Sequence, residues 1–399
     1  MANLKVKFKS KKVIFNILLW GKLIAFSIYY FIFLTIFRIF KINNSKIVII
    51  NFDGKGYGDM GKYIGNELIK HNYKIYWAAN KQYKDTLPKG IIYVKYNSLK
   101  YLFHMATAKV WINNIRFRYG MIKRKKQYYI QTWHAGITYK NVEKSAEKAL
   151  TKQYILNAKN DSKMANLFIS NSTYCTNLYK RDFWYDGEIL ECELPRADII
   201  VNHDATSINK VKEYYKIDND IKICLYAPTF RVDYSLDAYN IDYNSLINEL
   251  ETKFGGNWKV LVRLHPNISF LAKELGIYNE NVISATDYPD MQELLIASDF
   301  MITDYSSCIF EFALSKKPAL IYANDIEKYI KDRDFTLKLE DTPFPITTNN
   351  EELKNTIRDY NIEKYKKDLE VFNNDLGIHE TGQASKIIVE RINKVTGCE

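Results

Sequence analysis

His134 is the first residue whose type and setting suggest acid–base chemistry. It follows the run YYIQTW and precedes Ala135 and Gly136, two small residues that let a substrate approach closely. An imidazole has a pKa close to neutral and is suited to taking a proton from a hydroxyl nucleophile. The alternative interpretation is a structural histidine that only makes hydrogen bonds. The motif alone leaves both roles open.

Arg263 and His265 end a second apolar run, and both can face an anion. In an extended strand, residues two apart lie on one face, so this guanidinium and imidazole are expected to point at one phosphate. Pro266 follows directly and stops the strand. The same two residues can equally well cap the end of a sheet without binding a ligand.

Thr303-Asp304-Tyr305-Ser306-Ser307 joins an apolar run to a helical stretch. Consecutive hydroxyls and free backbone amides at a helix start suit a phosphate group. Serine and aspartate are also the ordinary N-cap residues, so Ser306 or Ser307 is expected to cap the helix whatever else it binds.

Two weaker motifs place arginines after apolar runs. The segment YAPTFR ends at Arg231, which is available to a phosphate or to the edge of a cytosine. The segment LPRAD, residues 194–198, carries less information still. Neither motif identifies a ligand by itself.

A glycine-rich segment, DGKGYGD, follows the first apolar run at residues 53–59. Its glycines are spaced GxGxG, whereas a dinucleotide-binding turn requires GxGxxG, and the next apolar run ends at Asn80 where an acidic residue would bind ribose. The segment is therefore interpreted either as a flexible strand-to-helix turn or as a loop that binds the acceptor or a phosphate.

The elements that must position these motifs form two series of apolar runs separated by helical or polar stretches. This alternation predicts parallel sheets covered by helices, in two Rossmann-like halves that face a cleft. Ligands of such sheets lie beyond the carboxyl ends of the strands, where the motifs fall. A last amphipathic helix near 383–395 is expected to cross back over the first half. The runs are 46–52, 74–79, 91–94, 110–114, 128–133 and 167–171, then 222–228, 258–266, 300–303 and 318–322, with helical stretches at 60–70, 243–253, 289–298 and 307–315.

Length and composition fit this two-domain organisation. The chain has 399 residues, 47% of them apolar, which is enough for two cores. The net charge of +11 indicates an anionic partner, but no nucleic-acid-binding motif is recognisable. The five cysteines show no CxxC or Cys/His spacing, which favours reduced thiols in a cytoplasmic protein and gives no metal site.

Residues 13–40 form an apolar stretch preceded by a lysine cluster. Lys22 interrupts it, and its longest uncharged run, Leu23 to Phe37, has fifteen residues, short for a membrane span. Basic residues flank both ends, against the positive-inside tendency of a single span. One or two helices lying on the cytoplasmic leaflet, with lysines on anionic headgroups, are therefore expected. A spanning helix and a buried helix pair are the alternatives.

Together the motifs resemble the CDP-glycerol glycerophosphotransferase family, the primases and polymerases of teichoic acids and related capsules. The family's tryptophan–histidine–glycine element is similar to Trp133-His134-Ala135, with alanine in place of glycine. The resemblance covers roughly residues 46–395. Its other elements are Pro195 to Asp198, with Ala197 in place of asparagine; Ala227 to Arg231; His265-Pro266; Thr303 to Ser307; Lys317 to Tyr322; and Tyr329 to Phe335, with Arg333-Asp334 in place of arginine–glycine.

The resemblance implies a GT-B-type α/β fold on a monotopic membrane anchor. It implies a membrane-association segment at 1–45, an acceptor domain at 46–205 and a CDP-donor domain at 206–399. By the same resemblance His134 would deprotonate the acceptor hydroxyl, and His265 would hold the pyrophosphate and assist departure of CMP. The remaining implied contacts are Arg231, Arg263, Thr303, Asp304, Ser306 and Ser307 to the donor, and Gly54, Gly56, Asp59, Trp133 and Gly136 to the acceptor.

The implied reaction is phosphoryl transfer by positioning and charge stabilisation, without a metal or cofactor. A hydroxyl of a lipid-linked glycopolymer attacks the β-phosphorus of a CDP-polyol, such as CDP-glycerol, in teichoic-acid or capsule synthesis. The enzyme would be peripheral on the cytoplasmic side of the cell membrane. A glycosyltransferase using a nucleotide sugar and a non-catalytic scaffold are the alternatives. The polyol, the acceptor, the length of the product and the oligomeric state are left open.

Overall fold

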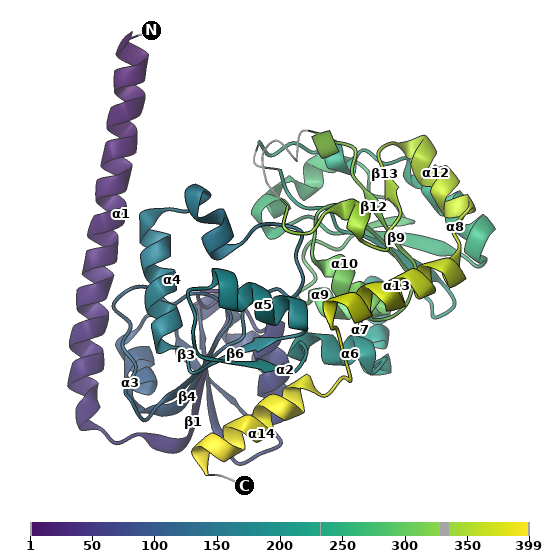
Figure 1. Cartoon of the computed structure of the whole chain (residues 1–399). Coiled ribbons are helices and arrows are strands. Elements are labelled where there is room, and N and C mark those ends of the chain that lie inside the picture. Colours follow the sequence, from purple (N-terminus) through teal and green to yellow (C-terminus); the bar gives the residue numbers. More distant parts are fainter. Residues whose placement is uncertain (1, 232, 328–334, 398–399) are drawn as a thin grey trace.

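The computed structural model describes residues 2–231, 233–327 and 335–397, which form two α/β domains and a long N-terminal helix (Figure 1). The first domain contains a seven-stranded parallel sheet of order β3-β2-β1-β4-β5-β6-β7. The continuous apolar run of β1 suits its central place, because both faces of a parallel sheet are covered. The strands are β1 (Asn43–Ile50), β2 (Lys74–Ala79), β3 (Ile91–Lys95), β4 (Ala108–Asn113), β5 (Tyr128–Gln131), β6 (Leu167–Ser170) and β7 (Glu188–Glu191).

The second domain contains a six-stranded parallel sheet of order β10-β9-β8-β11-β12-β13. In both sheets the strand order reverses beside the first strand, so each has the switch point at which open α/β sheets bind ligands. The glycine-rich loop follows β1, and the segments that contain Arg231 and Ser307 follow β8 and β11, all next to these switch points. His134 and His265 follow β5 and β9, one strand further away. The strands are β8 (Lys222–Tyr226), β9 (Trp258–Val262), β10 (Val282–Ser284), β11 (Phe300–Thr303), β12 (Ala319–Tyr322) and β13 (Ile346–Thr347).

Helices cover the sheets and connect the two domains. In the first domain they are α1 (Ala2–Ile36), η1 (Phe37–Ile39), α2 (Asp59–Leu68), η2 (Lys81–Thr86), α3 (Leu99–Thr107), η3 (Glu143–Ala149), α4 (Lys152–Met164) and α5 (Thr173–Asp182). Between the sheets lie η4 (Pro195–Ala197), α6 (Asp198–Val201) and α7 (Ala205–Tyr215). The remainder are η5 (Asp237–Tyr239), α8 (Tyr243–Phe254), η6 (Pro266–Leu275), α9 (Met291–Ala297), α10 (Cys308–Ala313), η7 (Leu339–Asp341), α12 (Asn350–Arg358), α13 (Ile362–Leu376) and α14 (Ala384–Thr396).

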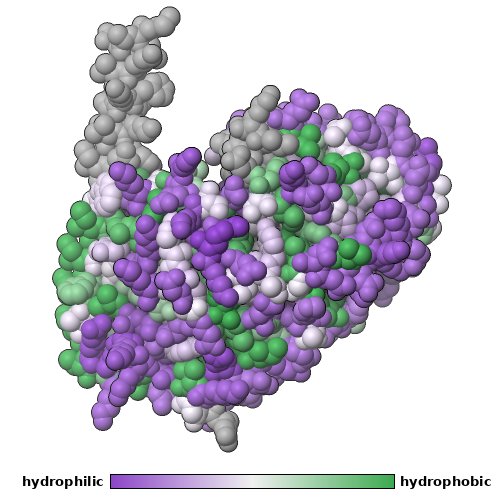
Figure 2. Space-filling view, viewed as in Figure 1, coloured by the Kyte–Doolittle hydropathy of each residue, from purple (hydrophilic) through white to green (hydrophobic). Residues whose placement is uncertain are grey.

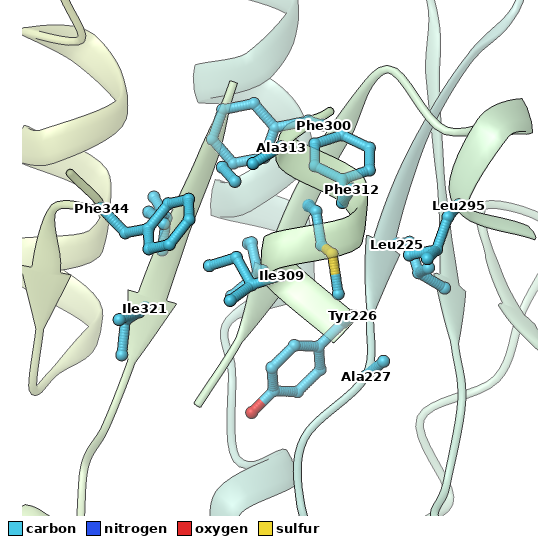
Figure 3. Packing of buried hydrophobic residues seen from close by; sticks show 14 of the residues in the cluster. Leu225, Tyr226, Ala227, Leu295, Phe300, Ile309, Phe312, Ala313, Ile321 and Phe344 are labelled. Atoms are coloured by element: carbon cyan, nitrogen blue, oxygen red, sulfur yellow. The ribbon is translucent and has the colours of Figure 1, made fainter. Parts of the chain in front are cut away.

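The short helix α10 is anchored in the core of the second domain. Ile309 and Phe312 on α10 are fully buried and belong to one cluster with Phe300, Ile321 and Phe344 (Figure 3). This packing fixes the start of α10, and with it the two serines that precede the helix, at the carboxyl end of β11.

The predicted fold class is confirmed, and each predicted apolar run overlaps an observed strand. The runs 74–79 and 300–303 match β2 and β11 to the residue. The short strands β7, β10 and β13 were not predicted. The boundary predicted after residue 205 falls at the first residue of α7, between the two sheets.

The last helix, α14, crosses back to the first domain as predicted (Figure 1). Ile388 and Ile392 are buried in the same cluster as Ile47 and Ile64 of the first domain. The two domains are therefore joined by the chain twice, once at residues 192–204 and once before α14.

The N-terminal segment is a single helix, α1, whose C-terminal half lies along the first domain (Figure 1). Leu18–Ile39 is long and apolar enough to cross a membrane by length and composition, and only Tyr30 and Leu34 within it are buried. That low burial contradicts the buried helix pair. Figure 2 shows hydrophobic surface along the part of the molecule that α1 borders, below the grey atoms. The exposed apolar residues of this region include Leu18, Ile24, Ile28, Phe31, Ile32, Ile36, Ile39 and Phe40.

Candidate active site

His134 follows β5 and is oriented by one hydrogen bond. Its Nδ1 lies 3.0 Å from the carbonyl oxygen of Asn114. A carbonyl can only accept, so Nδ1 carries the proton and Nε2 keeps its lone pair. Burial lowers the pKa of His134 below its ordinary value, although the nearby Asp59 carboxylate opposes the shift. His134 is therefore a neutral base at neutral pH.

Trp133 supports the His134 ring from the domain core. Its backbone has a left-handed φ of 54°, and its N–H donates to Gln131 Oε1 at 2.9 Å. The indole lies 4.3 Å from the His134 ring and 4.9 Å from that of Phe183, measured between centroids. Because only 6% of Trp133 is exposed, the indole belongs to the core that packs against the His134 ring.

Gly136 allows the loop after His134 to lie against β6. A Cβ atom at this position would stand 2.9 Å from Asn171 Oδ1. The preceding carbonyl, of Ala135, accepts a hydrogen bond from the Tyr179 hydroxyl at 3.0 Å. The main chain around the candidate base is thus fixed on both sides.

His265 follows β9 and carries its proton on the opposite ring nitrogen. Its Nδ1 accepts the N–H of Asn267 at 3.2 Å, so the neutral ring is protonated at Nε2. Burial, together with the nearby cations Lys140 and Arg263, lowers the pKa of His265 to about 4. The neutral ring offers an N–H donor to a substrate oxygen.

Arg263 braces the neighbouring loop. Its Nη1 donates to the carbonyl oxygens of Ala285 at 2.9 Å and Tyr288 at 2.8 Å. Burial lowers the pKa of this guanidinium. The expected pairing of Arg263 with His265 on one anion is not visible in these contacts, which hold the backbone that follows β10.

Arg231 is engaged by two carboxylates. Its Nη1 lies 2.8 Å from Asp304 Oδ2, and its Nε donates to Asp325 Oδ2 at 2.6 Å. Asp304 also accepts the N–H of Thr229 at 2.8 Å, and Tyr305 donates to Asp325 at 3.0 Å. This cluster ties the end of β8 to the loop that precedes α10.

The serines before α10 are placed differently from Thr303. Thr303 is fully buried, and its hydroxyl donates to the Ala227 carbonyl oxygen at 2.7 Å. Ser306 and Ser307 are half-buried. Ser306 Oγ lies 3.1 Å from Cys308 Sγ, and Ser307 occupies the N-cap position with no side-chain capping bond. The hydroxyl of Ser307 thus does not act as the expected N-cap.

The glycine-rich loop between β1 and α2 has an unusual backbone. Left-handed φ angles occur at Phe52, Asp53, Gly54, Gly56 and Asp59. A Cβ atom on Gly54 would lie 2.9 Å from Tyr96 Cβ, so this turn requires glycine. Phe52 brings its ring to 5.6 Å from that of His134.

Asp59 ends this loop and is buried against protein groups. Its Oδ1 lies 2.7 Å from Arg196 Nη1, and its Oδ2 accepts from Asn114 Nδ2 at 2.8 Å. Both carboxylate oxygens are therefore engaged, although Asp59 was expected to contact the acceptor. Sequence reasoning missed Asn114 altogether and gave Arg196 no role beyond a weak motif.

Two further features of the described residues bear on where the site lies. Among the described residues, no group of three or more His, Cys, Asp or Glu side chains is placed to hold a metal ion. A cavity of about 350 Å³ lies on the second domain, but it contains none of the motif residues. We therefore locate the site by its side-chain chemistry. The cavity is lined by Pro343, Pro345, Asn355, Thr356, Asp359, Tyr360, Asn361, Lys364, Tyr365 and Asp368.

Comparison with known proteins relates the chain to a sequence family. Residues 31–394 match the model of the CDP-glycerol:poly(glycerophosphate) glycerophosphotransferase family. The teichoic acid poly(glycerol phosphate) polymerase of Staphylococcus epidermidis is 32% identical over 89% of the chain, which spans about half (51%) of that relative's length. The teichoic acid glycerol-phosphate transferase of Staphylococcus aureus is 29% identical, over 94% of the chain and 98% of the relative.

Solved structures agree with this result. The wall teichoic acid polymerase TagF superposes with a TM-score of 0.80 at 28% identity, covering 92% of this chain and 93% of TagF. Another TagF structure, from a variant soaked with CDPG, superposes with a TM-score of 0.78. The GT-B-like architecture and the parallel sheets are therefore shared with TagF.

Proposed function

The chain belongs to the CDP-glycerol:poly(glycerophosphate) glycerophosphotransferase family, and we propose that it transfers a glycerol-phosphate or other polyol-phosphate unit from a CDP-linked donor. The acceptor is a hydroxyl of a lipid-linked glycopolymer in teichoic-acid or capsule synthesis, and the released product is CMP. The observation that carries this proposal is the pair of neutral histidines at strand ends, one with a free Nε2 lone pair and one with an Nε2–H.

The two histidines, in opposite tautomers, have different roles in the reaction. His134 Nε2 takes the proton of the acceptor hydroxyl, and the oxygen attacks the β-phosphorus of the donor. The bond between the β-phosphorus and the bridging oxygen breaks, and CMP leaves with that oxygen. His265 Nε2–H donates a hydrogen bond to the pyrophosphate, where negative charge develops.

Contact between the domains supports this division. The backbone N–H of Thr336 donates to Tyr139 O at 2.7 Å, which ties the loop after His134 to the second domain. Lys140 lies close enough to His265 to lower its pKa. The loop that starts at the candidate base therefore reaches the surroundings of the second histidine.

Donor binding is assigned to the half-buried residues of the second domain. Ser306 and Ser307 offer their hydroxyls to the donor phosphates at the start of α10, beside the buried cluster of Arg231 and Asp304. In this proposal Arg231, Thr303 and Asp304 shape the loop, because their polar atoms bond to protein. Gly54, Gly56 and Gly136 shape the acceptor side through their backbone, which adopts turns or close approaches that a side chain would hinder.

We also propose that α1 lies on the cytoplasmic face of the membrane and does not span it. One side of the helix is bound to the first domain, because Tyr30 donates to Asn97 Oδ1 at 2.7 Å and Ser27 donates to the Tyr119 carbonyl oxygen at 3.0 Å. Arg124 Nη1 donates to the Phe40 carbonyl oxygen at 2.7 Å, which brings the basic cluster 123–126 to the residue that follows α1 and η1. Apolar and basic groups side by side suit an anionic bilayer surface.

The test is CMP release from CDP-glycerol and from CDP-ribitol with a lipid-linked acceptor mixture. Release with one donor, lost in His134→Ala and retained in the control His71→Ala, supports the proposal and names the polyol. Near-normal CMP release by the His134→Ala variant would show that His134 is not the base. Binding of UDP-sugars in preference to CDP ligands would instead indicate the glycosyltransferase.

A further inference from the structure

Arg196 lies in η4, between the two sheets, and its guanidinium is buried. Nη1 donates to Asp59 Oδ1 at 2.7 Å and to the main-chain carbonyl oxygen of His134 at 3.0 Å. One nitrogen of this side chain therefore contacts both the start of α2 and the backbone of the candidate base.

The other side of the guanidinium faces the second domain. Nε donates to Glu311 Oε2 at 2.9 Å, and Nη2 donates to Glu311 Oε1 at 2.5 Å. Glu311 lies on α10, one turn after Ser307, and Gln292 Nε2 also donates to it at 3.0 Å. A bidentate pair of this kind fixes both distance and orientation.

Asn114 links Asp59 to His134 within the first domain. Its side chain donates to Asp59 Oδ2 at 2.8 Å, while its carbonyl oxygen accepts the Nδ1–H of His134. The ring of His134 and the backbone of His134 are thus bound to the same Asp59–Arg196 ion pair, one through Asn114 and one directly.

We propose that Arg196 is a positioning residue that holds His134 of the first domain in register with the serine-bearing start of α10 in the second. The inference rests on the proposed phosphotransfer between these two elements. Because attack requires the reacting atoms at about 3–3.5 Å with aligned orbitals, a small shift between the domains lowers the rate strongly.

A second ion pair across the same interface supplies a matched control. Lys62 on α2 lies 2.5 Å from Asp290 Oδ2 and 2.7 Å from Glu293 Oε1. It joins the same two domains, and within the described part of the chain its side chain contacts Asp290, Glu293 and the Tyr63 ring but neither His134 nor α10. The kcat of a Lys62 variant therefore measures the general effect of weakening the contact between the two domains.

The first experiment compares Arg196→Lys with Lys62→Met, both confirmed as folded by circular dichroism. Lysine keeps the charge but lacks the fork that contacts Asp59 and Glu311 together. We expect Arg196→Lys to lower kcat roughly 10²-fold, with the Kd for CDP-glycerol unchanged to within about twofold. Lys62→Met is expected to change kcat much less. Equal losses of kcat in the two variants, or normal kcat in Arg196→Lys, would overturn the inference.

The second experiment does not depend on turnover. The charged groups that face His134 are Asp59 on α2, Arg196 on η4 and Arg116 after β4. Titration of His134 by NMR, assigned with His134→Ala, is expected to show a lower pKa in Asp59→Asn and a higher pKa in Arg196→Gln. Absence of both shifts contradicts the positioning role. A wild-type protein that titrates as expected but releases no CMP from any CDP-polyol would refute the proposed function and leave the Arg196 coupling standing.

Discussion

His134 and His265 carry their ring protons on opposite nitrogens. The carbonyl oxygen of Asn114 places the His134 proton on Nδ1, and the N–H of Asn267 places the His265 proton on Nε2. Burial keeps both rings neutral by lowering their pKa values. One ring can therefore accept a proton from a nucleophile while the other donates a hydrogen bond to the group under attack.

The first prediction concerns the pH dependence of kcat/KM. A base works in its deprotonated form, and the pKa of His134 lies below its ordinary value of 6.5. As the pH falls from 7, kcat/KM is therefore expected to decline with a midpoint below pH 6.5. His265, with a pKa of about 4, stays neutral over that range. Initial rates in buffers of constant ionic strength test this, and a decline centred above pH 7 would contradict a buried neutral base.

The second prediction concerns the hydrogen bond from His265. His265→Ala removes the Nε2–H donor, and we expect kcat to fall roughly 10²–10³-fold, the usual cost of losing one donor to a developing charge. His265→Gln keeps an N–H donor and is expected to lose less. Steady-state rates with saturating donor give the comparison. Similar losses of kcat in both variants would indicate that the His265 ring acts through packing against Phe230. The centroids of these two rings lie 4.8 Å apart.

The strands of the sheets are easier to recognise in the sequence than the contacts around the candidate site. Buried parallel strands such as β2 and β11 are nearly continuous apolar runs, so they are visible in the sequence, whereas β7, which reads EILE at an edge, is not. Arg196 could not be assigned because its partners, Asp59 and Glu311, lie more than a hundred residues away in the chain. No local periodicity encodes such a contact. The tautomers of His134 and His265 could not be predicted from the sequence either, because each depends on a backbone group that the fold places beside the ring.

The third prediction concerns stability. Arg116 is buried between Glu143, at 2.9 Å, and Asp161, at 3.1 Å, and lies 5.3 Å from the centre of the Trp133 ring. Arg116→Met leaves two buried carboxylates without their cation, and we expect a loss of about 3–5 kcal/mol in the free energy of unfolding. Urea denaturation followed by tryptophan fluorescence measures it.

The control for this prediction is Arg391→Met. Arg391 pairs with Glu188 at 2.7 Å, but both side chains are partly exposed. Loss of that pair is expected to cost at most about 1 kcal/mol. Equal effects of the two substitutions would show that burial does not make the Arg116 ion pairs more important for stability than an exposed pair.

The fourth prediction concerns Gly136. Gly136→Ala would place a methyl group 2.9 Å from Asn171 Oδ1, so the loop after His134 must shift. We expect lower kcat from a folded protein, and recovery in the double variant Gly136→Ala/Asn171→Ser, whose shorter side chain makes room. Gly65→Ala, with its nearest contact at 3.4 Å on a helix, is the control expected to be harmless. A double variant no better than the single one would show that the close approach is not what requires glycine.

The fifth prediction concerns the membrane face of α1. Phe31 and Ile36 are 58% and 50% exposed on a helix whose other side is bound to the first domain. Replacing both with glutamate removes apolar area that would enter the bilayer and adds charge facing anionic lipid. We expect binding to vesicles containing phosphatidylglycerol to weaken by about tenfold or more, with CMP release from soluble acceptor analogues unchanged.

The matched control is Phe270→Glu, because Phe270 is a similarly exposed aromatic residue, at 69%, on the second domain. Its vesicle binding is expected to equal that of the wild type, and wild-type binding is expected to weaken in high salt, since the basic cluster 123–126 beside Phe40 adds an electrostatic contribution. Equal loss in both variants would place the lipid contact elsewhere. Resistance of the wild-type protein to extraction by high salt and alkaline carbonate would instead show that α1 leaves the domain surface and inserts across the bilayer.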